Sequence, residues 1–158
     1  MNNRPAVSNT TPLITLAGVG LLDLPPQLYG TVHIPRAVAA EYQAKAAASD
    51  PRLEQQPWLT IIDSVAVDPA LPKLGAGEAE AISLALLLGA RFILLDERKA
   101  RRVARLAGLT VVGTLALLLR AKERGLIPAI KPIVESMRAQ GRYFGDELIA
   151  RVLSDAGE

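Results

Sequence analysis

Cysteine is absent from this sequence, histidine occurs once and aromatic residues are scarce. The absence of cysteine excludes disulfides, zinc–thiolate sites and thiol nucleophiles. A single histidine, His33, leaves little from which to build a histidine-dependent nucleophilic triad. Aromatic residues make up 4% of the 158 residues, which argues against a surface of base-stacking platforms. We therefore interpret Trp58, Tyr143 and Phe144 as core or interface anchors.

The sequence also lacks a strong excess of charge of one sign and any long hydrophobic run. The formal net charge is +2, which is too small to indicate a nucleic-acid partner by itself. The longest apolar runs, 81–90 and 114–119, are too short to span a bilayer. The N-terminus has no apolar core of signal-peptide length after a basic start. We expect a soluble, cytoplasmic protein with no membrane partner.

Half of the residues are hydrophobic, and short aliphatic runs alternate with amphipathic ones. This alternation is typical of βαβ units. The predicted strands are 6–8, 31–34, 59–65, 92–95 and 110–112. One predicted helix begins at Thr10. The others are 37–48, 78–88, 98–107, 115–124, 130–139 and 146–156. Residues 50–57 are expected to be irregular. We predict one domain, 1–158, with helices on both sides of a mostly parallel sheet.

Polar residues follow the carboxyl ends of the predicted strands, where the functional residues of parallel α/β sheets usually lie. Asn9 and Asp96 each follow a predicted strand, and Glu78 begins a helix. Each has a structural alternative: Asn9 and Asp96 suit helix caps, and Glu78 suits a first helical turn. Glu41 suits a solvated helix face. If these oxygens converge, their repulsion favours a hard cation, Mg²⁺ or Mn²⁺. Composition and spacing do not show whether they converge.

Several segments together resemble a PIN domain, specifically a prokaryotic PIN-like family. The matching segments are VSNTTPLITLAGVGLLDL, IPRAVAAEY, GEAEAISLA, LLDERKAR, VVGT and the tail ending in DELIARVLSDAGE. The resemblance covers nearly the whole chain, and 50–73 is its least distinctive part. It implies a three-layer α/β/α fold with a mostly parallel central sheet. It also implies that the C-terminal helices, 128–158, are a family-specific extension.

The resemblance also implies an acidic quartet that binds Mg²⁺ or Mn²⁺ and hydrolyses RNA. The four positions fall on Asn9, Glu41, Glu78 and Asp96. Glu97 would support the fourth position, and the hydroxyl of Thr10 or Thr11 would orient a water. Glu80 lies about 200° round the helix from Glu78, so only one of the two is expected to be a ligand.

Asn9 departs from the family pattern, in which active members usually have Asp in the first motif. An amide oxygen still coordinates a hard cation, but the site loses one negative charge, so metal affinity should fall. This departure supports an alternative function, a PIN-like module that binds RNA or protein without hydrolysis. A third reading is a DNA-directed nuclease with the same metal chemistry.

A basic stretch beside the predicted site is the candidate contact for a phosphate backbone. It comprises Arg98, Lys99, Arg101, Arg102 and Arg105. The alternative is an exposed helix face that pairs with Glu97 or Asp63. The resemblance further implies a toxin of a toxin–antitoxin pair, with a small antitoxin protein as partner and a homodimer. Residues 114–119 together with the C-terminal helices are a candidate dimer or partner face.

Overall fold

A five-stranded parallel sheet forms the centre of the computed structural model, which describes residues 4–158. Its strands are β1 (Ala6–Ser8), β2 (Val32–Pro35), β3 (Leu59–Ile62), β4 (Phe92–Leu94) and β5 (Val111–Val112). The strand order is β3-β2-β1-β4-β5, and every pairing is parallel. Ala6 lies opposite both Val32 and Phe92, so β1 is the middle strand. The carboxyl ends of β1, β2 and β4 therefore meet at one edge.

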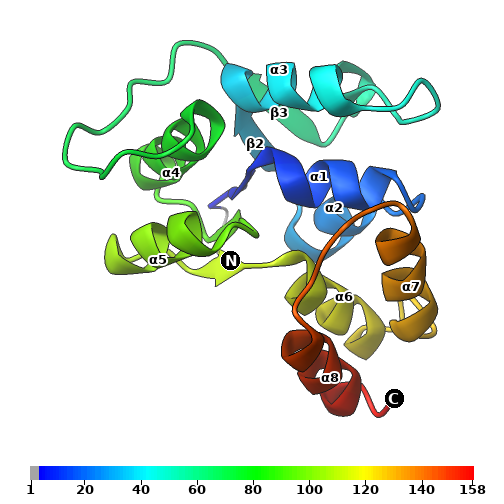
Figure 1. The fold of residues 1–158 in the computed structure, drawn as a ribbon. Coiled ribbons are helices and arrows are strands. Elements are labelled where there is room, and N and C mark those ends of the chain that lie inside the picture. Colours follow the sequence, from blue (N-terminus) through cyan, green and yellow to red (C-terminus); the bar gives the residue numbers. More distant parts are fainter. Residues whose placement is uncertain (1–3) are drawn as a thin grey trace.

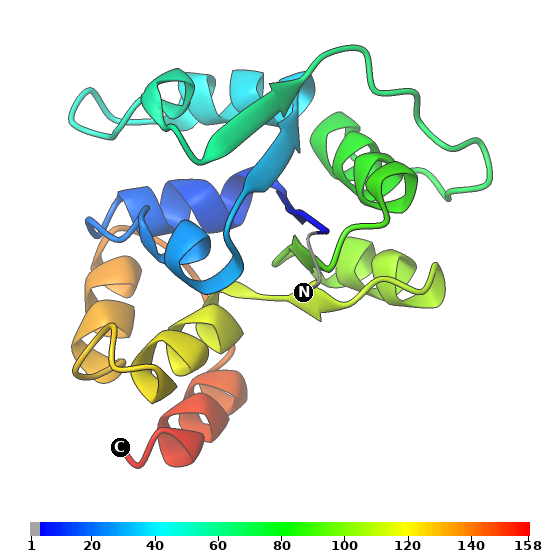
Figure 2. The same cartoon turned by 180° about the vertical axis from the view of Figure 1, so that it is seen from behind.

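Helices fill the connections and cover the sheet on both sides (Figures 1 and 2). In the described residues they are α1 (Thr10–Ala17), α2 (Leu24–Tyr29), α3 (Arg36–Lys45), α4 (Ala76–Leu88), α5 (Arg98–Leu106), α6 (Thr114–Glu123), α7 (Lys131–Ala139) and α8 (Asp146–Asp155), with a 3₁₀ turn at Leu53–Gln55. Among residues 4–158, no helix is long and apolar enough to cross a membrane.

Two apolar cores lie on the two faces of the sheet, because successive residues of a strand point to opposite faces. Ile93 packs into the core shared with α3, α4 and α5. Its neighbour Leu94 packs into the core shared with α6, α7 and α8. Both side chains are fully buried. The chain therefore has the predicted three-layer α/β/α fold, and its sheet is entirely rather than mostly parallel.

The structure differs from the predicted elements at several places. The helix α2 was not predicted. Pro25 and Pro26 lie in its first turn, where a missing N–H costs little. The helix predicted at 37–48 ends at Lys45, where Ala46 turns to an extended conformation. The strand predicted at 59–65 ends at Ile62, where its pairing with β2 also ends.

The candidate dimer face at 114–119 belongs largely to the core. Leu115, Leu117 and Leu118 are buried in the cluster that α7 and α8 complete. The end of the chain holds these helices in place, since the Glu158 carboxylate accepts hydrogen bonds from the N–H groups of Ile130 and Lys131. The chain thus covers most of this apolar face itself.

Candidate functional site

Asn9 stands at the carboxyl end of the middle strand and is almost completely buried. Its backbone N–H donates to the carbonyl of Leu94 at 2.9 Å, so it is held between β1 and β4. It occupies the N-cap position of α1, but its side chain makes no capping hydrogen bond. Its Oδ1 atom is buried without any hydrogen-bond partner. An amide oxygen in this state lacks the compensation that buried polar atoms normally have, so the capping role does not explain Asn9.

Glu41 is joined to the helix that follows Asn9. The hydroxyl of Thr10 donates to Glu41 Oε2 at 2.9 Å, which connects α1 to α3. The same carboxylate lies directly against Gly77 in the first turn of α4, where any Cβ would overlap it. Glycine at this position therefore allows α4 to approach the Glu41 carboxylate closely. The alternative interpretation of Glu41 as a solvated helix residue is wrong, since Glu41 is half-buried where α1, α3 and α4 meet.

Glu78 and Glu97 face each other between the beginnings of α4 and α5. Burial raises the pKa of Glu78, and the adjacent carboxylates of Glu97 and then Glu41 raise it further. Glu78 Oε2 is buried, and no donor group of the described residues bonds to it. A hydrogen bond between the Glu78 and Glu97 carboxyls contributes to the raised pKa of Glu78, since it favours the protonated form. Glu97 instead accepts from the N–H groups of Ala100 (2.7 Å) and Lys99 (3.1 Å), which hold its pKa low. Glu97 is thus the N-cap of α5.

Asp96 belongs to a second group of side chains, on the other side of the end of β4. Its Oδ1 accepts from the backbone N–H of Thr114 at 2.7 Å, and its Oδ2 accepts from the Thr114 hydroxyl at 2.5 Å. Burial raises the pKa of Asp96, while Thr114 and the Arg101 guanidinium oppose this rise. Arg101 and Asp96 both lie against Gly113, which has no side chain to separate them. Asp96 does not cap α5; the cap is Glu97.

The predicted site residues therefore form two neighbouring groups at one edge of the sheet. Glu41, Glu78 and Glu97 influence one another, whereas Asp96 is bonded to Thr114. Within residues 4–158, no three acidic or histidine side chains converge closely enough to hold a metal ion in their present positions. Glu80 is half-buried on α4. The assignment of the metal ligands stays a prediction.

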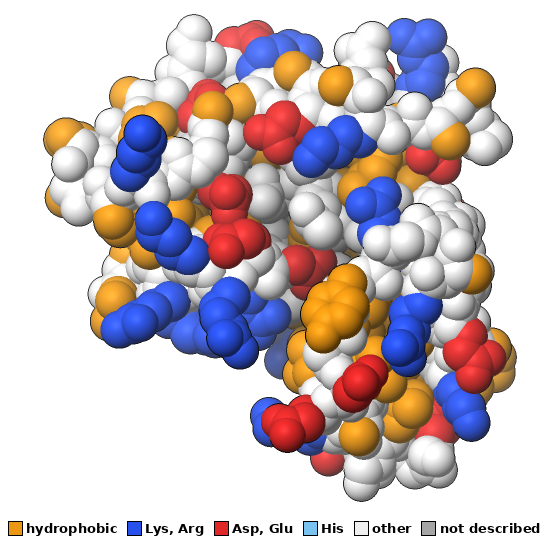
Figure 3. Space-filling view, in the orientation of Figure 1, with side chains coloured by type: hydrophobic (Ala, Val, Ile, Leu, Met, Phe, Trp, Pro, Cys, Tyr) orange, Lys and Arg blue, Asp and Glu red, His pale blue; other side chains and the backbone are white. Residues whose placement is uncertain are grey.

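The basic stretch forms the exposed side of α5. Arg98, Lys99, Arg102 and Arg105 are exposed and Arg101 is half-buried. The alternative of a helix face paired with Asp63 is wrong, because Asp63 binds Arg36 at 2.7 Å. No ion pair of the described residues involves α5. Figure 3 shows these basic side chains gathered beside acidic ones at the centre of the same face.

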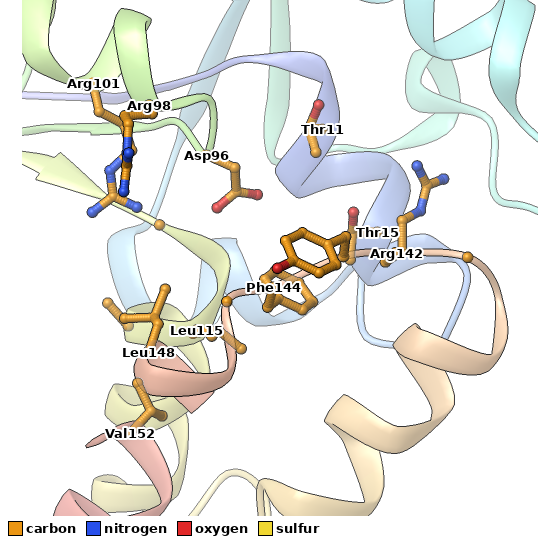
Figure 4. A pocket seen from close by; sticks show the side chains of 15 residues that line it. Thr11, Thr15, Asp96, Arg98, Arg101, Leu115, Arg142, Phe144, Leu148 and Val152 are labelled. Carbon is orange, nitrogen blue, oxygen red and sulfur yellow. The ribbon is translucent and has the colours of Figure 1, made fainter. Parts of the chain in front are cut away.

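A cleft of about 680 Å³ opens beside Asp96. Its one wall is the start of α5, with Arg98 and Arg101, and its other wall is the loop 141–145 with the start of α8. Figure 4 shows Asp96 between these two walls. Thr11 also lines the cleft, whereas the hydroxyl of the preceding residue, Thr10, binds Glu41 instead.

Three contributors to this site were not predicted as site residues: Gly113, Thr114 and Tyr143. The motif containing Gly113 and Thr114 is part of the family resemblance, but its bond to Asp96 joins residues 18 positions apart. Tyr143 lines the cleft and is 86% exposed, so it is not a core anchor; its alternative interpretation as an interface anchor stays a prediction. Nothing in a single sequence distinguishes an exposed tyrosine from a buried one at such a loop.

Comparison with known families is decisive for the class of this protein. Residues 5–158 match the model of the PIN domain family, and the chain belongs to that family. PIN domains are generally nucleases and typically use divalent metals. The family and the fold therefore support a nuclease-type hydrolase. No curated protein matches the chain in sequence.

Proposed function

We propose that this protein is a divalent-metal-dependent endoribonuclease. The ligands of Mg²⁺ or Mn²⁺ would be Asn9, Glu41, Glu78 and Asp96, with Glu97 beside them. The observation that supports this most is the pair of buried, unpartnered oxygens, Asn9 Oδ1 and Glu78 Oε2. Such atoms are rare in folded proteins, and a bound cation satisfies them.

The chemistry of the donor set fits a hard cation. All five candidate ligands offer oxygen, which Mg²⁺ and Mn²⁺ prefer, and neither cysteine nor histidine is among them. Burial first, and then the nearby Glu97 carboxyl, raise the pKa of Glu78, so ionising both carboxyls is unfavourable without a cation. A divalent cation would stabilise both ionised carboxyls and lower the pKa of Glu78. Because no three acidic side chains of the described residues converge, some of the ligands would have to turn toward one another when metal binds.

The surrounding residues would position the ligands and the substrate. A bound Mg²⁺ or Mn²⁺ would supply activation of water and neutralise charge on the scissile phosphate. Thr10 orients Glu41, and Thr114 orients Asp96 through two hydrogen bonds. The guanidinium groups of Arg98 and Arg101 lie on the wall beside Asp96, where they would bind RNA phosphates. Hydrolysis would then occur where the phosphate lies between the arginines and the acidic edge.

The biological role we propose is that of a toxin in a toxin–antitoxin pair. This rests on the family resemblance alone. A small antitoxin protein would inhibit the enzyme by covering the cleft and the basic side of α5. A homodimer would bring two such basic surfaces together.

Calorimetric titration of Mn²⁺ and Mg²⁺ tests the metal site directly. We expect saturable binding to the wild type and at least a tenfold weaker affinity for Glu78→Gln and Asp96→Asn, about 1.4 kcal/mol or more. Both replacements keep the side-chain shape. Glu123→Gln is the matched control, because Glu123 is an exposed carboxylate on α6. Equal binding in all four proteins would rule out this site.

Cleavage assays then test the reaction and its substrate. Labelled single-stranded RNA and DNA of one sequence are incubated with Mn²⁺ at equal concentration. We expect cleavage of RNA, lost in Glu78→Gln and Asp96→Asn. Preferential cleavage of DNA would support the DNA-directed alternative.

The second candidate function is a binding module without hydrolysis. Two observations favour it: Asn9 replaces the usual acidic residue, and in the described residues no three carboxylates converge. Under this function RNA binds equally well in EDTA and in Mn²⁺, and no cleavage follows. Weak or absent metal binding by the wild type, together with metal-independent RNA binding, would favour this candidate.

A further inference from the structure

The cleft beside Asp96 combines three kinds of surface that a nucleotide requires. Arg98, Arg101 and Arg142 supply positive charge, and Leu115, Leu148 and Val152 supply an apolar floor. Tyr143 supplies an exposed aromatic ring at the same cleft. Its volume of about 680 Å³ lies within the roughly 300–1,000 Å³ usual for ligand sites.

The loop that presents Tyr143 is fixed at both ends. On one side, the Arg142 N–H donates to the Met137 carbonyl at 3.0 Å, and Gln140 Nε2 donates to the Gly18 carbonyl at 2.7 Å. On the other, the Ile149 N–H donates to the Gly145 carbonyl at 3.0 Å and begins α8. Phe144, next in the chain, packs into the core with α6 and α8. Tyr143 is therefore held outward by an anchored neighbour, and its exposure follows from the backbone geometry of the loop.

An exposed ring beside arginines is suited to an unpaired base. A base in a duplex is already stacked and paired, whereas an unpaired base can stack on an aromatic side chain. Asp96 lies between the walls and repels a bare anion (Figure 4). A phosphate therefore belongs at Arg98 and Arg101, with the attached base on the opposite wall. Pocket-lining residues thus divide into a phosphate side and a base side.

We propose that Tyr143 is a base-stacking residue and that the loop 141–145 forms the base-binding wall of the cleft. One unpaired nucleotide would lie across it, with its base on Tyr143 and its phosphate at Arg98 and Arg101. The C-terminal segment thereby contributes directly to substrate binding and selects single-stranded RNA over duplex. This inference rests on the proposed function, because it names the part of that substrate which the cleft receives.

Fluorescence anisotropy with a labelled single-stranded RNA decamer, in EDTA, tests the inference without any cleavage. The variants are Tyr143→Ala and Tyr143→Phe, and Leu87→Ala is the control, since Leu87 is a similarly exposed side chain at the end of α4. We expect Tyr143→Ala to weaken binding about tenfold, as loss of one stacked base would. Tyr143→Phe keeps the ring and should stay within about twofold of the wild type. A blunt RNA duplex should bind Tyr143→Ala and wild type alike.

Three outcomes would overturn the inference. Tyr143→Ala binds the single strand as tightly as the wild type, or it loses affinity equally for single strand and duplex, or the wild type does not bind the decamer. Circular dichroism of each variant confirms that the fold is intact. Failure of the proposed hydrolysis is separately visible. Tyr143-dependent binding without cleavage would leave the base site standing and remove the nuclease. Cleavage of RNA by Tyr143→Ala with an unchanged KM would support the nuclease and exclude the base site.

Discussion

At the scale of single residues, Asn9 determines how strongly the edge of the sheet can attract a cation. It is 5% exposed, and its Oδ1 has no hydrogen-bond partner. As an amide it adds no charge at the edge of the sheet that also carries the interacting carboxyls of Glu41, Glu78 and Glu97. The free protein is thereby spared one buried charge, while the metal loses one anionic ligand. Asn9 thus favours the stability of the metal-free state over metal affinity.

We predict that Asn9→Asp strengthens Mn²⁺ binding by about tenfold or more, because a carboxylate at ligand distance attracts a divalent ion strongly even at an effective dielectric constant of about 20. In EDTA the same variant should be less stable than the wild type by about 1–3 kcal/mol, the usual cost of a buried group without a partner. Urea unfolding with and without Mn²⁺ measures both effects. Gln43→Glu, which adds a charge on the exposed face of α3, is the control. An Asn9→Asp variant that is destabilised equally with and without Mn²⁺ would contradict the prediction.

At the scale of elements, the last residue ties the C-terminal helices together. The Glu158 carboxylate accepts from the backbone N–H groups of Ile130 (2.7 Å) and Lys131 (3.0 Å) at the start of α7. It also binds Lys122 Nζ on α6 at 2.9 Å. These bonds lower the pKa of Glu158 from 4.5 to about 2, with the backbone bonds as the largest cause. A negative charge at the N-terminus of α7 is also favoured by the helix dipole.

The depressed pKa of Glu158 predicts a pH-dependent contribution to stability. Its ionised form is preferred in the folded state, so the contribution is complete above about pH 4.5 and is lost as the pH falls toward about 2. Glu158→Gln should therefore unfold at a lower urea concentration than the wild type at pH 7. The difference should shrink steadily between pH 5 and pH 3. Glu135→Gln, at an exposed carboxylate of α7, is the control. A difference that is constant or grows toward low pH would exclude this role.

At the scale of the whole molecule, one face carries a local group of basic side chains over α5, next to acidic ones. Carboxylates gather at the end of the sheet, and α5 presents arginines beside them (Figure 3). The net charge of +2 conceals this arrangement. No ion pair of the described residues involves α5, and Arg98, Arg102 and Arg105 are exposed, so these three cations are available to a polyanion.

We predict that RNA affinity depends on salt through α5. For single strands, each phosphate contact that is lost reduces the slope of log K against log salt by about 0.7. The double variant Arg102→Ala with Arg105→Ala should therefore show a slope about 1.4 smaller than the wild type. Arg52→Ala removes an exposed arginine near the 3₁₀ turn and should leave the slope unchanged. Equal slopes for all three proteins would show that α5 does not contact the backbone.

Much of the fold could be predicted from local sequence. The run from Phe92 to Leu94 is a buried strand because its side chains are aliphatic or aromatic on both faces, as a covered parallel strand requires. Gly89 ends α4 in a left-handed conformation, as its place after an apolar helix suggested. The helix α2 escaped prediction because two prolines in a first turn resemble a turn between elements.

The site was only partly predictable for a related reason. The sequence by itself determined that this is an α/β chain, that Asn9 and Asp96 follow strands and that Glu78 begins a helix, because hydrophobic periodicity is a local property of the chain. Glu41, in the middle of α3, was singled out only by the family resemblance. Only the tertiary structure decided which side chains meet. Glu97 caps α5, Asp96 binds Thr114, and Tyr143 stays exposed above the cleft. The Asp96–Thr114 bond and the exposure of Tyr143 depend on how segments far apart in the chain pack together. The Glu97 cap depends on a side-chain rotamer. A sequence pattern specifies neither the packing nor the rotamer.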